Sequence, residues 1–176
     1  GGWRLGYFII PENLKIIKDT LNILASETFS AVSAPIQYAA IQAYETDHND
    51  YINISRKILK SVGEYVYDNL NSNKILINKP QGGFYLMPEF ITNRFNSSSE
   101  MCDIILKETG VALLPGSDFG FGEKKMLVRL SYTDFDGKNF MSEFKKKSKI
   151  DEHLILECAP KVVEGVLKLK KWSETI

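Results

Sequence analysis

Three amphipathic helical patterns follow one another along the first part of this sequence, and short strand patterns come after them. The first helix is predicted to begin at Pro11, where apolar residues recur every three or four positions. The second begins at Ser33 or Ala34, and the third follows the polar segment 47–50 and stops at residues 71–73. Because strands do not alternate regularly with helices, a doubly wound parallel sheet is disfavoured. We expect an α+β fold in which helices pack on one face of a small sheet.

Strand and helix signals mix along the rest of the chain. Short strands are predicted at residues 3–10, 74–78, 83–87, 111–114 and 126–131. Ser97 and Glu100 have the spacing of a capping box, and the helix behind them is expected to end at Gly110. Residues 134–150 are polar and basic, which predicts a loop or a frayed helix. A terminal helix is predicted after Pro160, where apolar residues again recur at helical spacing.

The composition argues against several functional classes. The chain has 22 basic and 22 acidic residues and therefore a net charge of zero, so neither nucleic acid nor a charged membrane surface is an expected partner. Neither a signal peptide nor a membrane-spanning stretch is expected. Cys102 and Cys158 lack the spacing of a zinc site, and we expect both to be reduced and buried, as in a cytoplasmic protein. With two histidines in the chain, no metal site is predicted.

Two arginines lie in apolar strand patterns and are candidates for anion binding. Arg4 is flanked by bulky apolar residues, where a guanidinium is costly to bury without an anionic partner. Its head either reaches solvent or a carboxylate of the chain, or binds an anion such as phosphate. Alternation would put Leu127, Arg129 and Ser131 on one face of a strand. Arg129 is then either an edge charge that discourages aggregation or a planar fork that grips a carboxylate.

Two glycine-rich segments precede or follow the predicted strands. Residues 115–122 lack the spacing of a phosphate-binding loop, so a loop with special backbone angles near a ligand is the simpler interpretation. Residues 79–85 place two glycines ahead of the aromatic pair Phe84 and Tyr85. Most segments of this kind are plain hairpin connections.

Five segments, taken in order, resemble those of class I/II aminotransferases, the fold-type I enzymes that use pyridoxal 5′-phosphate. Gly2-Trp3-Arg4-Leu5-Gly6-Tyr7 is similar to the family's G-W-R-x-G segment, and residues 33–40 are similar to its S-x-P-x-Q-x-A-A helix start. Residues 80–85 resemble P-x-G-G-F-Y, residues 110–120 resemble G-V-x-x-x-P-G-x-x-F-G, and residues 128–131 resemble the V-R-L-S strand. Each motif is weak alone, but five in the same order are specific.

The resemblance extends over about residues 1–173 and implies an architecture. It implies the small C-terminal domain of an aminotransferase, with a short mixed sheet covered by helices and preceded by one strand that belongs to the large domain. Residues 1–32 would form the C-terminal edge of the large cofactor-binding domain and a connecting helix, and residues 33–176 the small domain. The family is typically a homodimer with sites at the subunit interface, so a homodimer is expected.

The resemblance also implies roles for single residues. Arg4 would bind the phosphate of the cofactor, and Arg129 would bind the α-carboxylate of the substrate. The aromatic wall near the site would include Phe84 or Tyr85, and we assign Phe84 to substrate binding. The substrates would be an amino acid and a 2-oxo acid.

The family's Schiff-base lysine lies just upstream of the G-W-R segment, where this chain begins. We therefore expect a C-terminal fragment of an aminotransferase that is inactive alone, has no catalytic residue of its own and holds no covalently bound cofactor. Such a fragment would expose apolar surface. Two alternatives are open: another fold-type I enzyme (a lyase, decarboxylase or synthase), or a non-catalytic α+β lobe that serves interactions.

Overall fold

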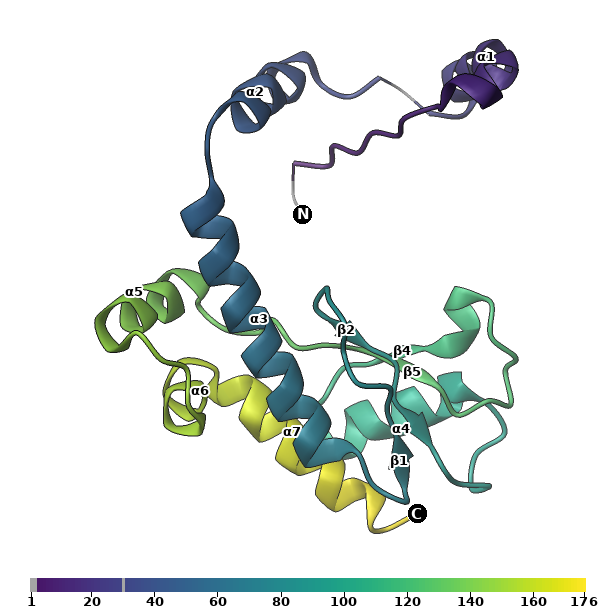
Figure 1. The fold of residues 1–176 in the computed structure, drawn as a ribbon. Helices are drawn as coiled ribbons and strands as arrows, with labels where there is room; N and C mark the ends of the chain where they lie inside the picture. Colours follow the sequence, from purple (N-terminus) through teal and green to yellow (C-terminus); the bar gives the residue numbers. More distant parts are fainter. Residues whose placement is uncertain (1–2, 30) are drawn as a thin grey trace. The chain divides into compact units, whose positions relative to one another are not determined.

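The computed structural model describes residues 3–29 and 31–176, and packing divides the chain into two units, Gly1–Asn49 and Asp50–Ile176 (Figure 1). The division follows contacts within the chain. It does not test where the large domain of a longer protein would end, so the boundary between residues 32 and 33 stays a prediction.

The N-terminal unit contains the first two predicted helices. A 3-10 turn, η1 (Glu12–Ile17), leads into α1 (Lys18–Thr28), and α2 (Ala34–Glu45) follows. Pro35 lies in the first turn of α2, where its missing N–H leaves no hydrogen bond unmade. The predicted helix starts at Pro11 and at Ser33 or Ala34 are thus confirmed.

The strand predicted at residues 3–10 is wrong, because the structure assigns no strand there. A β-strand requires the backbone groups of a neighbouring strand, and no described residue pairs with this segment. A run of bulky apolar side chains alone does not make a ladder. The large-domain strand that was expected to precede the small domain is therefore absent from the described residues.

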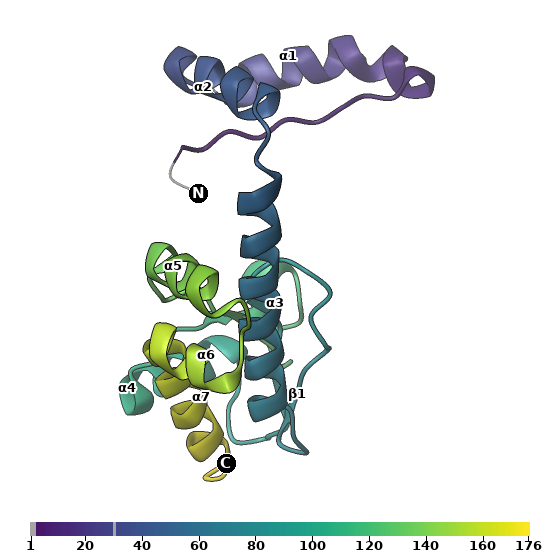
Figure 2. The same cartoon turned by 60° about the vertical axis from the view of Figure 1, so that its left-hand side comes forward.

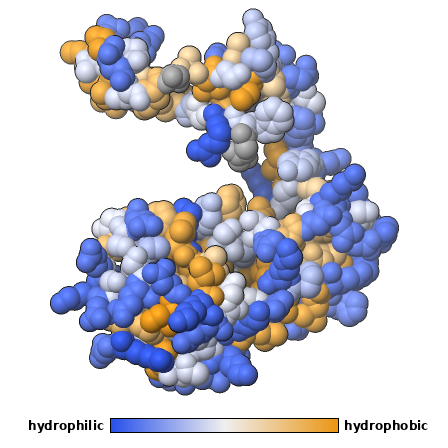
Figure 3. Space-filling model, turned by 180° about the vertical axis from the view of Figure 1, so that it is seen from behind, coloured by the Kyte–Doolittle hydropathy of each residue, from blue (hydrophilic) through white to orange (hydrophobic). Residues whose placement is uncertain are grey.

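None of the described residues in the N-terminal unit is buried. Most of its large apolar side chains are instead exposed, and orange apolar surface is visible on this unit in Figure 3. The most exposed of them are Trp3, Tyr7, Phe8, Ile9, Ile16, Phe29, Tyr38 and Tyr44. This confirms the expectation that the chain exposes apolar surface.

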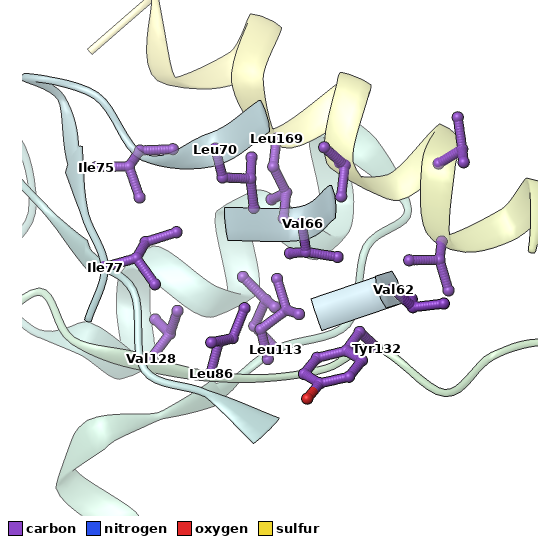
Figure 4. Close-up of a cluster of buried hydrophobic side chains, with 14 of the residues drawn as sticks. Val62, Val66, Leu70, Ile75, Ile77, Leu86, Leu113, Val128, Tyr132 and Leu169 are labelled. Atoms are coloured by element: carbon purple, nitrogen blue, oxygen red, sulfur yellow. The ribbon is translucent and has the colours of Figure 1, made fainter. Parts of the chain in front are cut away.

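The second unit is built around α3 (Asn49–Leu70), the predicted third helix. Ile58, Val62, Val66 and Leu70 recur at helical spacing and are buried, so one face of α3 forms the centre of the core. In Figure 4 this face meets the apolar side of the strands and Leu169. The packing of one amphipathic helix against one sheet face is the arrangement that the sequence predicts.

Helix α4 (Ser98–Thr109) begins at the predicted capping box. The Ser97 hydroxyl accepts a hydrogen bond from the Glu100 N–H at 3.1 Å. The Glu100 carboxylate accepts in return from the Asn96 N–H at 2.7 Å, one residue earlier than the usual box. Gly110 ends the helix with a φ of 74°, a left-handed conformation that glycine adopts without strain.

Within the described part of the chain, five short strands form two antiparallel sheets. Strand β1 (Ile75–Leu76) pairs with β3 (Glu89–Phe90). A second sheet has the order β2–β5–β4, with β2 (Tyr85–Leu86), β5 (Val128–Ser131) and β4 (Leu114–Pro115). The α+β fold is confirmed, but all of these pairings are antiparallel, so the sheet is not the mixed sheet that we expected.

The glycine-rich segment 79–83 does not close a hairpin. The strands on its two sides belong to different sheets, since β1 pairs with β3 and β2 pairs with β5. The hairpin interpretation is therefore wrong. Strand β3 was not predicted, because two residues are too short a pattern to show alternation.

Of the two states predicted for residues 134–150, the loop is wrong over residues 137–147, and a helix with a capped start is observed there. Helix α5 (Gly137–Lys147) is capped by the Asp136 carboxylate, which accepts hydrogen bonds from two backbone N–H groups at 2.9 and 3.0 Å. Phe140 is fully buried and anchors the helix. Tertiary burial of one aromatic residue thus outweighs the polar composition of the segment.

Two further helices complete the second unit. Helix α6 (Glu152–Cys158) was missed, although Asp151 caps it, and α7 (Pro160–Ser173) is the predicted terminal helix. Figure 2 shows α5, α6 and α7 following one another along one side of α3.

Trp172 joins α7 to α4 and to strand β3. Its indole N–H donates to the Glu108 carboxylate at 2.7 Å. Its ring stacks on Phe95 with the centroids 5.8 Å apart and meets Phe90 edge-on at 5.7 Å.

We predict that Trp172→Phe lowers the free energy of unfolding by about 1–3 kcal/mol, because a buried hydrogen bond is lost and a cavity is left. Urea denaturation followed by circular dichroism measures the change. Leu167→Ala is the control, since Leu167 lies on the same helix with 55% of its surface exposed. Equal stability of Trp172→Phe and wild type would contradict the role of this contact.

Both cysteines belong to the core, as predicted. Cys102 and Cys158 are 5% and 4% exposed and form no disulfide. Burial raises the pKa of the Cys102 thiol to about 11 and also raises the pKa of Cys158. A raised pKa keeps a thiol protonated and unreactive at neutral pH.

We therefore predict that neither thiol reacts rapidly with a disulfide reagent at pH 8 in the folded chain, and that both react once the chain is unfolded in urea. Absorbance of the released thiolate measures both rates. Rapid stoichiometric reaction in the native state would show that a thiol is accessible and ionised.

Candidate carboxylate-binding site

The backbone of β5 places Arg129 on the outer face of the sheet. Val128 and Leu130 are buried, whereas Arg129 is half-buried and Ser131 is exposed. The predicted alternation therefore holds within β5. It does not extend to Leu127, which precedes the strand and is buried.

Strand β5 is the middle strand of its three-stranded sheet. An edge charge lies on an outer strand, where it blocks pairing with another chain. The edge-charge interpretation of Arg129 is therefore wrong, and the planar fork that grips a carboxylate is the interpretation that stays open.

Aromatic rings from two other elements lie against the Arg129 guanidinium. Its central carbon is 4.4 Å from the centroid of the Tyr85 ring and 4.4 Å from that of Phe119. Tyr85 lies on β2, which flanks β5 on one side. Phe119 ends the 3-10 turn η2 (Gly116–Phe119) that follows β4, the strand on the other side. These distances are within the range of cation–π interactions.

The glycine-rich segment 115–122 positions Phe119. Gly116 donates its N–H to the Leu127 carbonyl at 2.8 Å, and a Cβ on Gly116 would lie only 2.8 Å from that oxygen. Only glycine fits there. Gly120 then ends the turn with a φ of 83°. The loop with special backbone angles predicted here is confirmed, and it holds an aromatic ring against the arginine.

The guanidinium of Arg129 has no counter-ion among residues 3–29 and 31–176. None of the ion pairs or side-chain hydrogen bonds within this part of the chain includes it. Its N–H groups are therefore unengaged by the described chain. An arginine in this state can bind a carboxylate through two parallel hydrogen bonds.

Phe84 and Tyr85 lie in different relations to the arginine. The Phe84 ring packs against Tyr85 with the centroids 4.3 Å apart, and 39% of its surface is exposed. Tyr85 is the residue of the pair that contacts Arg129. The substrate-binding role assigned to Phe84 stays a prediction. Phe119 was not identified, although its position between two glycines of segment 115–122 was a usable signal.

Arg4 belongs to the N-terminal unit and is exposed. Its φ is 50°, a left-handed conformation that costs a residue with a side chain about 1 kcal/mol or more. Within the described residues it forms no ion pair. A carboxylate partner in its own chain is thus not observed, and phosphate binding stays a prediction.

Recesses elsewhere on the second unit do not include Arg129. One of about 760 Å³ is lined by Tyr51, Ile58, Phe135 and Met141 among others, and one of about 730 Å³ lies beside segment 79–83.

Residues 3–29 and 31–176 contain neither a candidate metal centre nor a helix suited to spanning a membrane. No group of histidine, cysteine or acidic side chains there is arranged to hold a metal ion. No described helix is both long and apolar enough to cross a membrane.

Comparison with known proteins places these features in a family. A family model described as aminotransferase class I and II matches residues 1–140. An aspartate aminotransferase of Bacillus sp. (strain YM-2) is 36% identical over 136 residues, which are 74% of this chain and 33% of that protein. A probable aspartate/prephenate aminotransferase of Aquifex aeolicus is 27% identical over 179 residues, 99% of this chain and 38% of that protein.

A solved structure agrees with these relatives. The alanine aminotransferase from Pyrococcus furiosus superimposes with a TM-score of 0.69 at 27% identity, covering 99% of this chain and 39% of that one. The chain spans about a third of the length of the curated relatives that it matches. Aminotransferases of this class generally use pyridoxal phosphate. The match over residues 1–140, together with the 36% identical relative, shows that this chain belongs to the class I and II aminotransferase family.

Proposed function

We propose that this chain is the C-terminal part of a pyridoxal 5′-phosphate-dependent aminotransferase that transfers an amino group between an amino acid and a 2-oxo acid. The observation that carries the proposal is Arg129, a half-buried arginine on a middle strand with no counter-ion among the described residues. Family membership supports it. Because the chain spans about a third of its relatives, the activity belongs to a longer protein.

Arg129 binds the α-carboxylate of the substrate in this proposal. The amino acid and the 2-oxo acid both carry a carboxylate beside the reacting carbon, so one arginine can hold the substrate in both halves of the reaction. Two parallel hydrogen bonds from a planar guanidinium fix direction as well as distance. The arginine thereby orients the reacting carbon.

Arg4 binds the phosphate of the cofactor in this proposal. Its exposed guanidinium has no ion-pair partner among the described residues and suits a phosphate group chemically. When bound, pyridoxal 5′-phosphate supplies an electron sink that makes removal of the substrate α-proton possible. No lysine of this chain is assigned to hold the cofactor covalently. In this proposal the Schiff-base lysine belongs to the rest of the longer protein.

Two further features belong to the proposed enzyme: an aromatic wall beside the substrate and the assembly of two subunits. The exposed Phe84 ring forms part of the wall against the substrate side chain. The protein acts as a homodimer, which the exposed apolar residues Tyr38, Ile41 and Tyr44 of α2 support.

We predict that Arg129→Ala in the longer enzyme lowers kcat/KM for the amino acid by about 2–4 kcal/mol of transition-state binding, roughly 30- to 1000-fold. Steady-state kinetics with detection of the 2-oxo acid measures this. Arg94→Ala is the matched control, since Arg94 is exposed on the same unit and its guanidinium donates to the Thr175 carbonyl. An unchanged kcat/KM would remove the proposed role, and release of ammonia or CO₂ in place of a 2-oxo acid would favour a lyase or decarboxylase.

We predict that Arg4→Ala weakens cofactor binding about 10- to 100-fold, because a charge-assisted contact to phosphate is lost. Equilibrium dialysis with absorbance of the free cofactor gives the dissociation constant. Lys15→Ala is the control, since Lys15 is an exposed cation of the same unit that pairs with Glu12. Equal cofactor affinity of Arg4→Ala and the control would assign the phosphate to another residue.

A further inference from the structure

Arg129 is held by contacts with aromatic rings, whereas many protein arginines are held by an ion pair with a carboxylate. Its guanidinium carbon is 4.4 Å from each of two ring centroids, and no described carboxylate pairs with it. We propose that Tyr85 and Phe119 form an aromatic clamp that positions Arg129 for a carboxylate. This inference rests on the proposed function of Arg129 and assigns its two positioning residues.

The topology of the sheet brings the two rings to Arg129 from opposite sides. Tyr85 comes from β2 and Phe119 from the turn after β4, and β5 lies between these strands. Both ring centroids lie at the same short distance from the guanidinium carbon, so the two rings flank it. The N–H groups lie in the plane of the guanidinium, and none of them is hydrogen-bonded within the described chain.

This geometry leaves the hydrogen-bond donors of the arginine unused. A carboxylate placed beside Arg129 would hold the side chain equally well, but it would occupy the donors and compete with the substrate. Aromatic faces attract the cation through their quadrupole and accept no N–H bond in the guanidinium plane. The clamp therefore restricts the rotamers of a long side chain while keeping its binding edge open.

A second arginine in the same unit shows the contrast. The Arg94 guanidinium lies over one ring, Phe95, at 5.7 Å and donates to the Thr175 carbonyl. Among the described residues one ring is in cation–π contact with it, at the longer distance, and one of its donors is engaged. Arg94 is held as a structural arginine, whereas Arg129 is held with its donors free of the described chain.

The clamp residues are themselves held in place. Tyr85 pairs with Ser131 in the sheet, and its ring rests on Phe84. Phe119 is positioned by the close approach of Gly116 to Leu127. Phe84 thus supports the clamp through Tyr85, whether or not it also touches the substrate.

Phe119→Leu and Phe121→Leu form a matched pair for the test. Both phenylalanines lie in segment 115–122 and have similar exposure, 40% and 43%, but the Phe121 ring lies near Lys125 and not near Arg129. In the cofactor-loaded longer enzyme, Phe119→Leu and Tyr85→Leu are expected to raise KM for the amino acid about 3- to 30-fold, with a smaller change in kcat. Phe121→Leu is expected to change KM less than about twofold. Tyr85→Phe and Phe119→Tyr keep the rings and are expected to retain the wild-type KM.

A second readout does not depend on activity. In the ¹⁵N-labelled 176-residue chain, the Nε–Hε resonance of Arg129, assigned by its loss in Arg129→Lys, is expected to be displaced by the currents of the two rings. Phe119→Leu should move it, and Phe121→Leu should not. Replacement of Phe119 by trifluorophenylalanine keeps the shape of the ring and weakens its negative face, so it should raise KM even if a leucine variant folds poorly.

The outcomes separate the clamp from the proposed function. A resonance and a KM that stay at wild-type values in both leucine variants would overturn the clamp. A resonance that moves while KM stays unchanged would also overturn its positioning role, provided that Arg129→Ala lowers kcat/KM. If Arg129→Ala itself leaves kcat/KM unchanged, the proposed function fails together with any role of the clamp in catalysis, and the resonance reports only how the side chain is held.

Discussion

The candidate site depends on the register of β5 against the core. Val128 and Leu130 are buried among the side chains of the second unit, so the residue between them must lie on the opposite face. A shift of one residue would bury the guanidinium and expose both aliphatic side chains, which is strongly unfavourable. The burial of two apolar residues thus determines where the cation of Arg129 lies.

The cation of Arg129 is held in a way that leaves it able to bind a ligand. A guanidinium in a protein needs partners that replace part of its hydration, and the most common partner is a carboxylate. Around Arg129 the described chain supplies the faces of Tyr85 and Phe119. Rings stabilise the charge without neutralising it, so a positive charge with unengaged donors is available on the outer face of the sheet. This arrangement suits the binding of a small carboxylic acid.

The N-terminal unit has a different physical basis. Its helices are short and none of its described residues is buried, whereas helices of this length are marginal in water without tertiary packing. The exposed apolar side chains of η1, α1 and α2 and the left-handed backbone at Arg4 therefore require contacts that this unit does not supply. In the longer protein proposed above, its other segments and the partner subunit would supply these contacts.

The sequence by itself determined those features that depend on neighbouring residues. Helical periodicity located α1 to α4 and α7, the Ser97 capping box located the start of α4, and the ordered motifs identified the family. Only the tertiary structure decided strand pairing, the helical state of residues 137–147 and the partners of Arg129. The physical reason is that these features join parts of the chain whose contact no local pattern specifies. Strand ladders, the burial of Phe140 and the contact between Phe119 and Arg129 therefore exist only once the core has formed.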